Sequence, residues 1–292
     1  MHVLLCSDQV SQVCPNSMVL SRRPPLVRID RIHVYGADIF ISYQGVTRLR
    51  DGYFANVFLA RRKGDLQKIV IKVINKRRST EILNRLKSTV TYRDELELQL
   101  QCEHDNILRC FYHFQSDEQM CLELETIAER DLKEHVIHDG PLPNHILLPF
   151  ISQMIQAISH VHDRGVVHRD VKLENMYVNH SSNLATFCKL GDFGLAKRAS
   201  KLSGCKTLCG TLECMAPEVC ATTITNVAYG QQVDVWSLGI SLFMAATGES
   251  PYTNGDLRLQ VMAGEISWTS PIPATVNNVL RRMLLVLSLI HI

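Results

Sequence analysis

The chain has 292 residues, of which 46% are hydrophobic and 21% are charged, an ordinary composition for a globular protein of about two domains. This composition excludes disordered and fibrous proteins, and no apolar run approaches the roughly 20 residues that are needed to cross a bilayer. Lys and Arg together number 31 and Asp and Glu 29, so the net charge of +2 indicates neither a nucleic acid nor a membrane surface as partner.

The first part of the chain divides into a leader and a small lobe with strand signals. Residues 1–38 mix Pro, Ser, Cys and Arg without a period of 2 or 3.6, which predicts a flexible leader. In the small lobe, residues 39–126, runs rich in β-branched residues at 57–59 and 69–74 predict strands. The beginning of this lobe is therefore expected to be a sheet.

Helical patterns first appear in the small lobe and then dominate the region beyond it. Residues 81–101 contain neither Gly nor Pro and predict one long surface helix, before a further strand at 120–125. In the region 127–292, five apolar residues recur at the spacing of one helical face: Ile151, Met154, Ile155, Ile158 and Val161. This helix is expected to end at Gly165. The sequence thus predicts an α+β fold with a small sheet lobe, a larger and mostly helical lobe, and ligands bound between them.

Four short motifs follow one another in the large lobe. Residues 168–175 read H-R-D-V-K-L-E-N, and D-F-G stands at 192–194. A-P-E follows at 216–218 and D-V-W-S-L-G at 234–239. Each motif alone is as easily a solvated loop, but their joint order makes coincidence negligible. The sequence resembles the eukaryotic-type protein serine/threonine kinase family, whose catalytic loop is H-R-D-x-K-x-x-N and whose metal loop is D-F-G.

The resemblance implies a bilobal kinase fold with an antiparallel sheet, and it assigns roles to the motif residues. Asp170 would orient the acceptor hydroxyl, Lys172 would contact the transferred phosphate, and Asn175 and Asp192 would hold Mg²⁺. Such a site needs oxygen ligands for the metal, because the transferred phosphoryl group carries its charge on oxygens. Asp234 would anchor the catalytic loop from a buried helix.

The same resemblance places ATP against the small lobe. Lys72 closes a strand where the family has the lysine that grips the α- and β-phosphates, and counting back from the H-x-N turn gives Glu95 as its partner. The implied cofactors are ATP and Mg²⁺. The residues implied in nucleotide binding are Leu49, Gly52, Val57, Val70, Lys72, Glu125 and Tyr177.

Three departures from the family pattern leave a second function open. Only Gly52 remains of the three glycines in the phosphate-covering loop, and Val70 and Tyr177 alter the adenine slot. Gln99 replaces the apolar residue that stacks on the Phe of D-F-G, and must find hydrogen-bond partners. The alternative is a pseudokinase that acts as a nucleotide-binding or interaction scaffold.

The segment before A-P-E resembles the activation segment of the cyclic-nucleotide, calmodulin and checkpoint types of kinase. On that pattern Thr207 is phosphorylated by an upstream kinase, and its phosphate pairs with Arg169 and Lys197. Thr211, together with Lys172, implies Ser or Thr rather than Tyr acceptors in the protein substrates.

Two acidic residues and the cysteines bear on partners and location. Glu174 and Asp131 match positions where some relatives hold substrate arginines, so basic motifs are one possibility for the substrates. The ten cysteines lack a Cys-x-x-Cys pair and the chain lacks a signal peptide, which predicts an intracellular location, cytoplasmic or nuclear.

The resemblance covers residues 46–284, and residues 285–292 replace the family's D-P-x-x-R turn. The large lobe is therefore expected to be truncated at its end, and a poorly folding fragment is a third reading.

Overall fold

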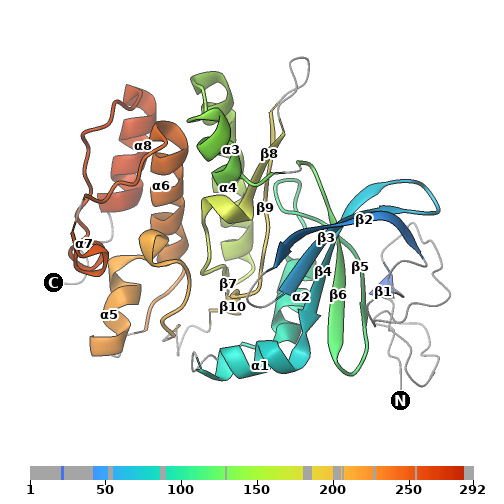
Figure 1. Ribbon diagram of the computed structural model, residues 1–292. Helices are drawn as coiled ribbons and strands as arrows, with labels where there is room; N and C mark the ends of the chain where they lie inside the picture. Colours follow the sequence, from blue (N-terminus) through green and yellow to red (C-terminus); the bar gives the residue numbers. More distant parts are fainter. Residues whose placement is uncertain are drawn as a thin grey trace. The chain divides into compact units, whose positions relative to one another are not determined.

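The computed structural model describes residues 21–22, 42–51, 55–85, 90–128, 130–179, 186–199, 205, 207–225, 228–253 and 255–285. The chain forms two units, of which the first is Met1–Leu100 with Leu108–Thr126 and the second is Gln101–Ile107 with Ile127–Ile292. Figure 1 shows the first unit as a sheet accompanied by helices and the second as mostly helical, which confirms the expected α+β class. The segment Gln101–Ile107 belongs to the second unit, although the sequence placed it in the small lobe.

An antiparallel sheet in the order β1-β5-β6-β4-β3-β2 forms the first unit. Its strands are β1 (Ser21–Arg22), β2 (Tyr43–Asp51), β3 (Ala55–Arg62), β4 (Lys68–Asn75), β5 (Cys110–Gln115) and β6 (Gln119–Glu125). The strands predicted at 57–59, 69–74 and 120–125 are confirmed, because β-branched and apolar residues suit a sheet that is buried on one face. The leader predicted at 1–38 lies outside the described residues, except for the two residues of β1.

The prediction of one helix over 81–101 is wrong. The structure has two helices, α1 (Lys76–Arg85) and α2 (Tyr92–Gln101). Before α2, the backbone N–H and the hydroxyl of Thr91 both donate to Asp94 Oδ2, at 2.6 and 2.8 Å, and Asp94 N–H donates to the Thr91 carbonyl. Such a cap, made by two residues three apart, starts a new helix. The Thr-x-x-Asp signal was present in the sequence.

A buried ionic network ties the outer strands of the first unit to its centre. Tyr43 Oη on β2 donates to Glu123 Oε2 on β6 at 2.6 Å, and Arg62 on β3 pairs with the other oxygen of Glu123. Arg62 Nη1 also lies 2.5 Å from Asp65 Oδ2. Burial, followed by the charge of Glu123, raises the pKa of Tyr43. The network spans β4, so it holds β2, β3 and β6 in register.

We expect the stability of the first unit to depend on pH through His113 on β5. Its Nε2 atom is buried without a hydrogen-bond partner among the described residues, and burial lowers its pKa to about 4. The unfolded chain binds the proton more strongly, so stability decreases as the pH falls from about 6.5 towards 4, by up to about 3 kcal/mol. Denaturant unfolding at pH 7, 5.5 and 4.5 measures the loss. The His113→Leu variant should lack this part of the pH dependence. If the free energy of unfolding changed equally with pH in the variant and the wild type, the assignment to His113 would be wrong.

Helices dominate the second unit. They are α3 (Leu132–Asp139), α4 (Asn144–Asp163), α5 (Pro217–Thr225), α6 (Gln232–Thr247), α7 (Leu257–Ala263) and α8 (Ala274–Leu285). Two small antiparallel pairs accompany them, β7 (Val166–Val167) with β10 (Lys197–Arg198) and β8 (Met176–Asn179) with β9 (Phe187–Leu190). Short 3-10 turns occupy η2 (Leu173–Asn175) and η3 (Leu212–Cys214). Among the described residues, no helix combines the length and the apolar character needed to span a membrane.

The helix predicted from the apolar stripe is α4, with one correction. Met154, Ile158 and Val161 are buried as expected, whereas Ile155 is 40% exposed. Ile155 lies about 100° around the helix from Met154, and thus at the flank of the buried face. Gly165, at a φ of +68°, follows the last turn, and its N–H donates to the His162 carbonyl. This left-handed position explains why the helix ends where the glycine predicted.

Candidate active site

The catalytic loop predicted at 168–175 is held by a buried carboxylate. Asp234, in the first turn of α6, accepts the backbone N–H of His168 at Oδ2 and that of Arg169 at Oδ1, both at 2.8 Å. His162 Nε2 lies 2.9 Å from Asp234 Oδ2. Arg169 has a φ of +66°, a left-handed conformation that a non-glycine residue keeps only when its surroundings hold it. Asp234 therefore fixes the start of the loop, the place that the sequence assigned to it.

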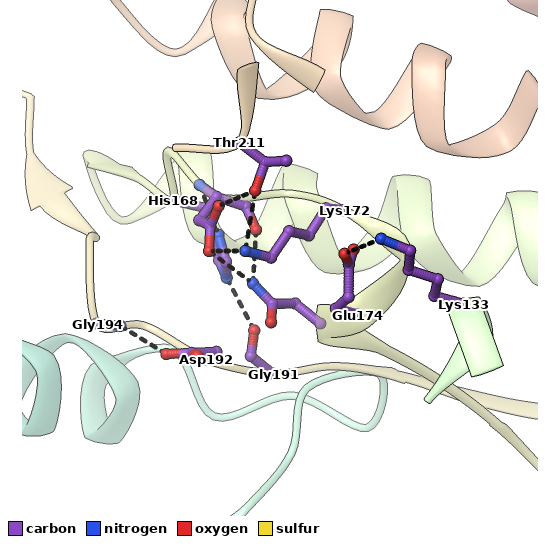
Figure 2. Close-up of polar contacts among 10 residues, drawn as sticks. Lys133, His168, Lys172, Glu174, Gly191, Asp192, Gly194 and Thr211 are labelled. Carbon is purple, nitrogen blue, oxygen red and sulfur yellow. Dashed lines mark hydrogen bonds and ion pairs between the residues drawn. The ribbon is translucent and has the colours of Figure 1, made fainter. Parts of the chain in front are cut away.

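Three residues predicted for catalysis or metal binding, Lys172, Asn175 and Thr211, converge on the carboxylate of a fourth, Asp170 (Figure 2). Lys172 Nζ lies 2.8 Å from Asp170 Oδ2 and 3.0 Å from Thr211 Oγ1. The Thr211 hydroxyl lies 3.4 Å from Asp170 Oδ1, a long hydrogen bond. Asn175 Nδ2 donates to Asp170 Oδ2 at 3.0 Å and to the Asp170 carbonyl at 2.8 Å. Among the described residues, Asp170 Oδ2 therefore has two close partners, Lys172 and Asn175, while Oδ1 has only the long contact with Thr211.

The D-F-G segment is anchored through its phenylalanine and presents its aspartate to solvent. Phe193 is fully buried and meets the ring of His168 edge-on, with ring centroids 4.9 Å apart. Asp192 is exposed, has a φ of +62°, and accepts the Gly194 N–H at 3.0 Å. The Gly191 N–H donates to the Asn175 carbonyl at 2.8 Å, so the two predicted metal ligands lie on adjoining segments.

The donor set of these two residues fits Mg²⁺. Both hydrogens of the Asn175 amide point to Asp170, which leaves its amide oxygen as an acceptor, and Asp192 contributes a carboxylate. Within the described part of the chain, no group of three or more His, Cys, Asp or Glu residues could hold a metal ion. A site with one carboxylate and one amide oxygen suits Mg²⁺, which keeps several waters and takes further ligands from phosphates.

In the first unit, Lys72 and Glu95 form a buried ion pair. Lys72 lies on β4 between β3 and β6, and its Nζ is 2.5 Å from Glu95 Oε1 in the first turn of α2. Both side chains are almost fully buried. Because the pair is buried, each side chain helps to hold the other in position, and removal of either would weaken that hold.

The remaining residues predicted to bind the nucleotide are distributed over both units. Val57 and Val70 are half-buried on neighbouring strands of the first unit, and Leu49 on β2 is 43% exposed. Glu125 ends β6 and accepts the Arg109 N–H at 3.1 Å, and Tyr177 is half-buried on β8 of the second unit. Gly52 lies outside the described residues.

Gln99 has the hydrogen-bond partner that its burial requires. The residue is buried on α2, and its Nε2 donates to the carbonyl of Leu108 at 3.1 Å. The desolvation penalty that the sequence suggested is thereby offset within the first unit.

A buried guanidinium faces the activation segment. Arg169 donates from Nε to the Leu195 carbonyl at 2.7 Å, but its Nη1 and Nη2 atoms are buried without hydrogen-bond partners among the described residues. Arg169 lines a pocket together with Cys209, Gly210 and Tyr229. Burial raises the pKa of the Cys209 thiol despite the nearby positive charge of Arg169, so this thiol does not supply an anion.

Tyr229 holds the activation segment at three points, a role that sequence analysis missed. Its backbone pairs with Cys205 through two hydrogen bonds of 2.8 Å. Its hydroxyl donates to the Thr207 carbonyl at 2.6 Å and lies 3.8 Å from Cys209 Sγ. The Thr207 side chain is buried, and Lys197 lies half-buried on β10. No local pattern marks Tyr229, because its partners are 20 to 24 residues away in the sequence.

Comparison with known proteins gives a family model and many relatives. The model described as "Protein kinase domain" matches residues 43–284. A probable myosin light chain kinase of Dictyostelium discoideum is 34% identical over 220 residues, which cover 75% of this chain and 43% of the relative. The serine/threonine-protein kinase cds1 of Schizosaccharomyces pombe is 30% identical over 252 residues, 85% of this chain and 52% of the relative. An Aurora kinase of Candida glabrata is 31% identical over 214 residues, which cover 73% of this chain and 56% of the relative. The chain thus spans about half the length of these relatives.

Proposed function

Because this chain belongs to the protein kinase family, we propose that it transfers the γ-phosphate of ATP to Ser or Thr hydroxyls of protein substrates. The observation that carries the proposal is the cluster of Asp170, Lys172 and Thr211, which sets a proton acceptor beside a cation. Phosphoryl transfer depends on positioning and on stabilisation of charge, and this cluster offers both. The serine/threonine kinases among the relatives support the choice of acceptor.

In the proposed reaction, the substrate hydroxyl donates its hydrogen bond to Asp170 Oδ1. As the hydroxyl oxygen bonds to the γ-phosphorus and the bond to the leaving ADP breaks, Asp170 takes up the proton. Lys172 is held by Asp170 and Thr211 and stabilises the negative charge on the transferred group. Bound Mg²⁺ supplies further charge neutralisation, and the Asn175 amide and the Asp192 carboxylate would hold it.

We assign the nucleotide itself to the residues that the resemblance implied. The Lys72 ammonium, fixed by Glu95, would bind the α- and β-phosphates. The other proposed nucleotide contacts are Leu49, Gly52, Val57, Val70, Glu125 and Tyr177. The protein is proposed to work inside the cell, in the cytoplasm or the nucleus, because the eight described cysteines are all free and buried.

The decisive test is phosphate transfer by purified chain that circular dichroism shows to be folded. With Mg-ATP labelled on the γ-phosphate and a generic Ser/Thr-rich protein as acceptor, we expect phosphoserine or phosphothreonine after acid hydrolysis. A parallel sample with a chelator in excess over Mg²⁺ should show none. A folded chain whose melting temperature rises with Mg-ATP but that transfers no phosphate would contradict the proposal and favour the pseudokinase alternative.

Phosphorylation of Thr207 by an upstream kinase is proposed to order the activation segment. The supporting observation is that Arg169 carries two buried nitrogens that lack hydrogen-bond partners within the described ranges, and that it lines a pocket in this segment. A phosphate on Thr207 would satisfy them by charge-assisted hydrogen bonds, with Lys197 as a second cation.

We expect treatment with the upstream kinase to raise the rate of the wild-type chain by about tenfold or more, which corresponds to one strong charge-assisted interaction. Thr207→Ala should lose this response and Thr207→Ser should keep it. Initial rates before and after the treatment measure the effect. Full activation of Thr207→Ala would show that another residue is the switch.

A further inference from the structure

Near the proposed acceptor site, the carboxylate of Glu174 is already paired with a lysine of the chain, Lys133. Lys133 Nζ, from the first turn of α3, lies 2.7 Å from Glu174 Oε1 in the turn η2 (Figure 2). The hydrogen bond that Lys133 donates to Glu174 raises the pKa of Lys133, and the negative charge of Glu213 adds to this effect. Partial burial would raise the pKa of Glu174, but the bond from Lys133 and the charge of Lys172 lower it. The pair is therefore fully ionised at neutral pH.

The Lys133–Glu174 ion pair lies close enough to the proposed catalytic loop to contact substrate side chains on either side of the acceptor Ser or Thr. Glu174 follows Asp170 by four residues in the same loop, and Lys172, which bridges Asp170 and Thr211, acts on the charge of Glu174. A peptide that brings a hydroxyl to Asp170 must therefore carry neighbouring side chains past Glu174. The Lys133 side chain is 45% exposed and that of Glu174 25%, so solvent and an incoming cation reach the pair.

The second carboxylate that the sequence associated with basic substrates is engaged inside the chain as well. Asp131 is buried, caps the N-terminus of α3, and accepts the Glu134 N–H at 2.9 Å. A substrate cation would therefore find Asp131 used by the helix and Glu174 used by Lys133.

We propose that Lys133 determines substrate specificity by competing with basic side chains of the substrate for Glu174. This inference rests on the proposed kinase function. While Lys133 is paired with Glu174, a substrate Arg near the acceptor Ser or Thr adds little binding energy, because it must first displace the Lys133 ammonium group. Loss of Lys133 frees the carboxylate and turns this edge of the site into one that selects basic residues.

The test compares peptides that differ only by Arg or Gln at each position flanking one Ser. We expect the wild-type ratio of kcat/KM, Arg over Gln, to stay within about threefold of unity at every position. Lys133→Met should raise this ratio about tenfold at one position or more, as expected when a charge partner becomes available. The double variant Lys133→Met with Glu174→Gln should lose the gain, and Lys63→Met, at an exposed turn of the first unit, should match the wild type.

Three results would overturn the inference while the kinase proposal stands. The first is a wild-type chain that already favours Arg about tenfold, and the second is an active Lys133→Met chain with unchanged ratios. The third is persistence of the gain in the double variant, which would show that Glu174 is not the acceptor of the substrate cation. No transfer to any peptide by the folded wild-type chain would instead contradict the kinase function together with this inference, so the two failures are distinguishable.

Discussion

Replacement of Asp170 by Asn should lower kcat by about 100- to 10,000-fold, the usual contribution of a positioned general base. Asn has the shape of Asp but cannot take up the proton of the acceptor hydroxyl. Its amide oxygen can still face the donors Lys172 and Asn175, and its NH₂ group can face the Thr211 hydroxyl, so the loop is expected to keep its structure. The measurement is kcat at saturating Mg-ATP and peptide.

Two controls make this result specific to Asp170. Asp117→Asn, at the exposed turn between β5 and β6, should leave kcat unchanged. The rise of the melting temperature with Mg-ATP should be the same for Asp170→Asn and the wild type, because Asp170 is not assigned to the nucleotide. A loss of less than about tenfold in an otherwise intact variant would mean that another group accepts the proton.

Replacement of Asp234 by Ala should destabilise the chain by about 3–5 kcal/mol and abolish most of the activity. The change removes the acceptor of two buried N–H groups, those of His168 and Arg169, and the partner of His162. Arg169 would also lose the support for its left-handed backbone, so the loop that carries Asp170 would no longer be held in one conformation. Urea unfolding measures the stability, and kcat at a temperature where the variant is folded measures the activity.

Asp256 provides a matched control for this prediction. Like Asp234 it accepts two backbone N–H groups, those of Arg258 and Leu259, but it does so at the exposed start of α7. Asp256→Ala should therefore cost only about 1 kcal/mol, the usual value of an N-cap, and leave kcat unchanged. If Asp234→Ala kept a normal kcat in the folded state, the anchoring of the catalytic loop would not matter for the reaction.

The features that could be predicted from the sequence are those encoded by residues close together in the chain. Strands such as β4 were predictable because their β-branched residues stand side by side, and the order of the motifs located Asp170 and Asn175. The break between α1 and α2 carried a local signal, the pair Thr91 and Asp94, that the absence of Gly and Pro obscured.

Other parts of the site depend on tertiary contacts that leave no mark in a single sequence. Lys133 meets Glu174 across 41 residues, and Tyr229 meets Thr207 across 22. An isolated lysine or tyrosine on an element has no periodicity or motif to distinguish it from a surface residue. The same holds for Gln99, whose partner is a backbone carbonyl that any residue at position 108 would provide.

The three contacts of Tyr229 have a kinetic consequence for the proposed switch. Thr207 is only 8% exposed, and the bonds to Cys205 and to the Thr207 carbonyl must break before an upstream enzyme reaches its hydroxyl. In the proposed switch, that enzyme would act on the molecules in which the segment is open, and its observed rate would scale with their fraction. The contacts of Tyr229 would then set the rate at which the chain is phosphorylated, without changing the activity of the phosphorylated chain.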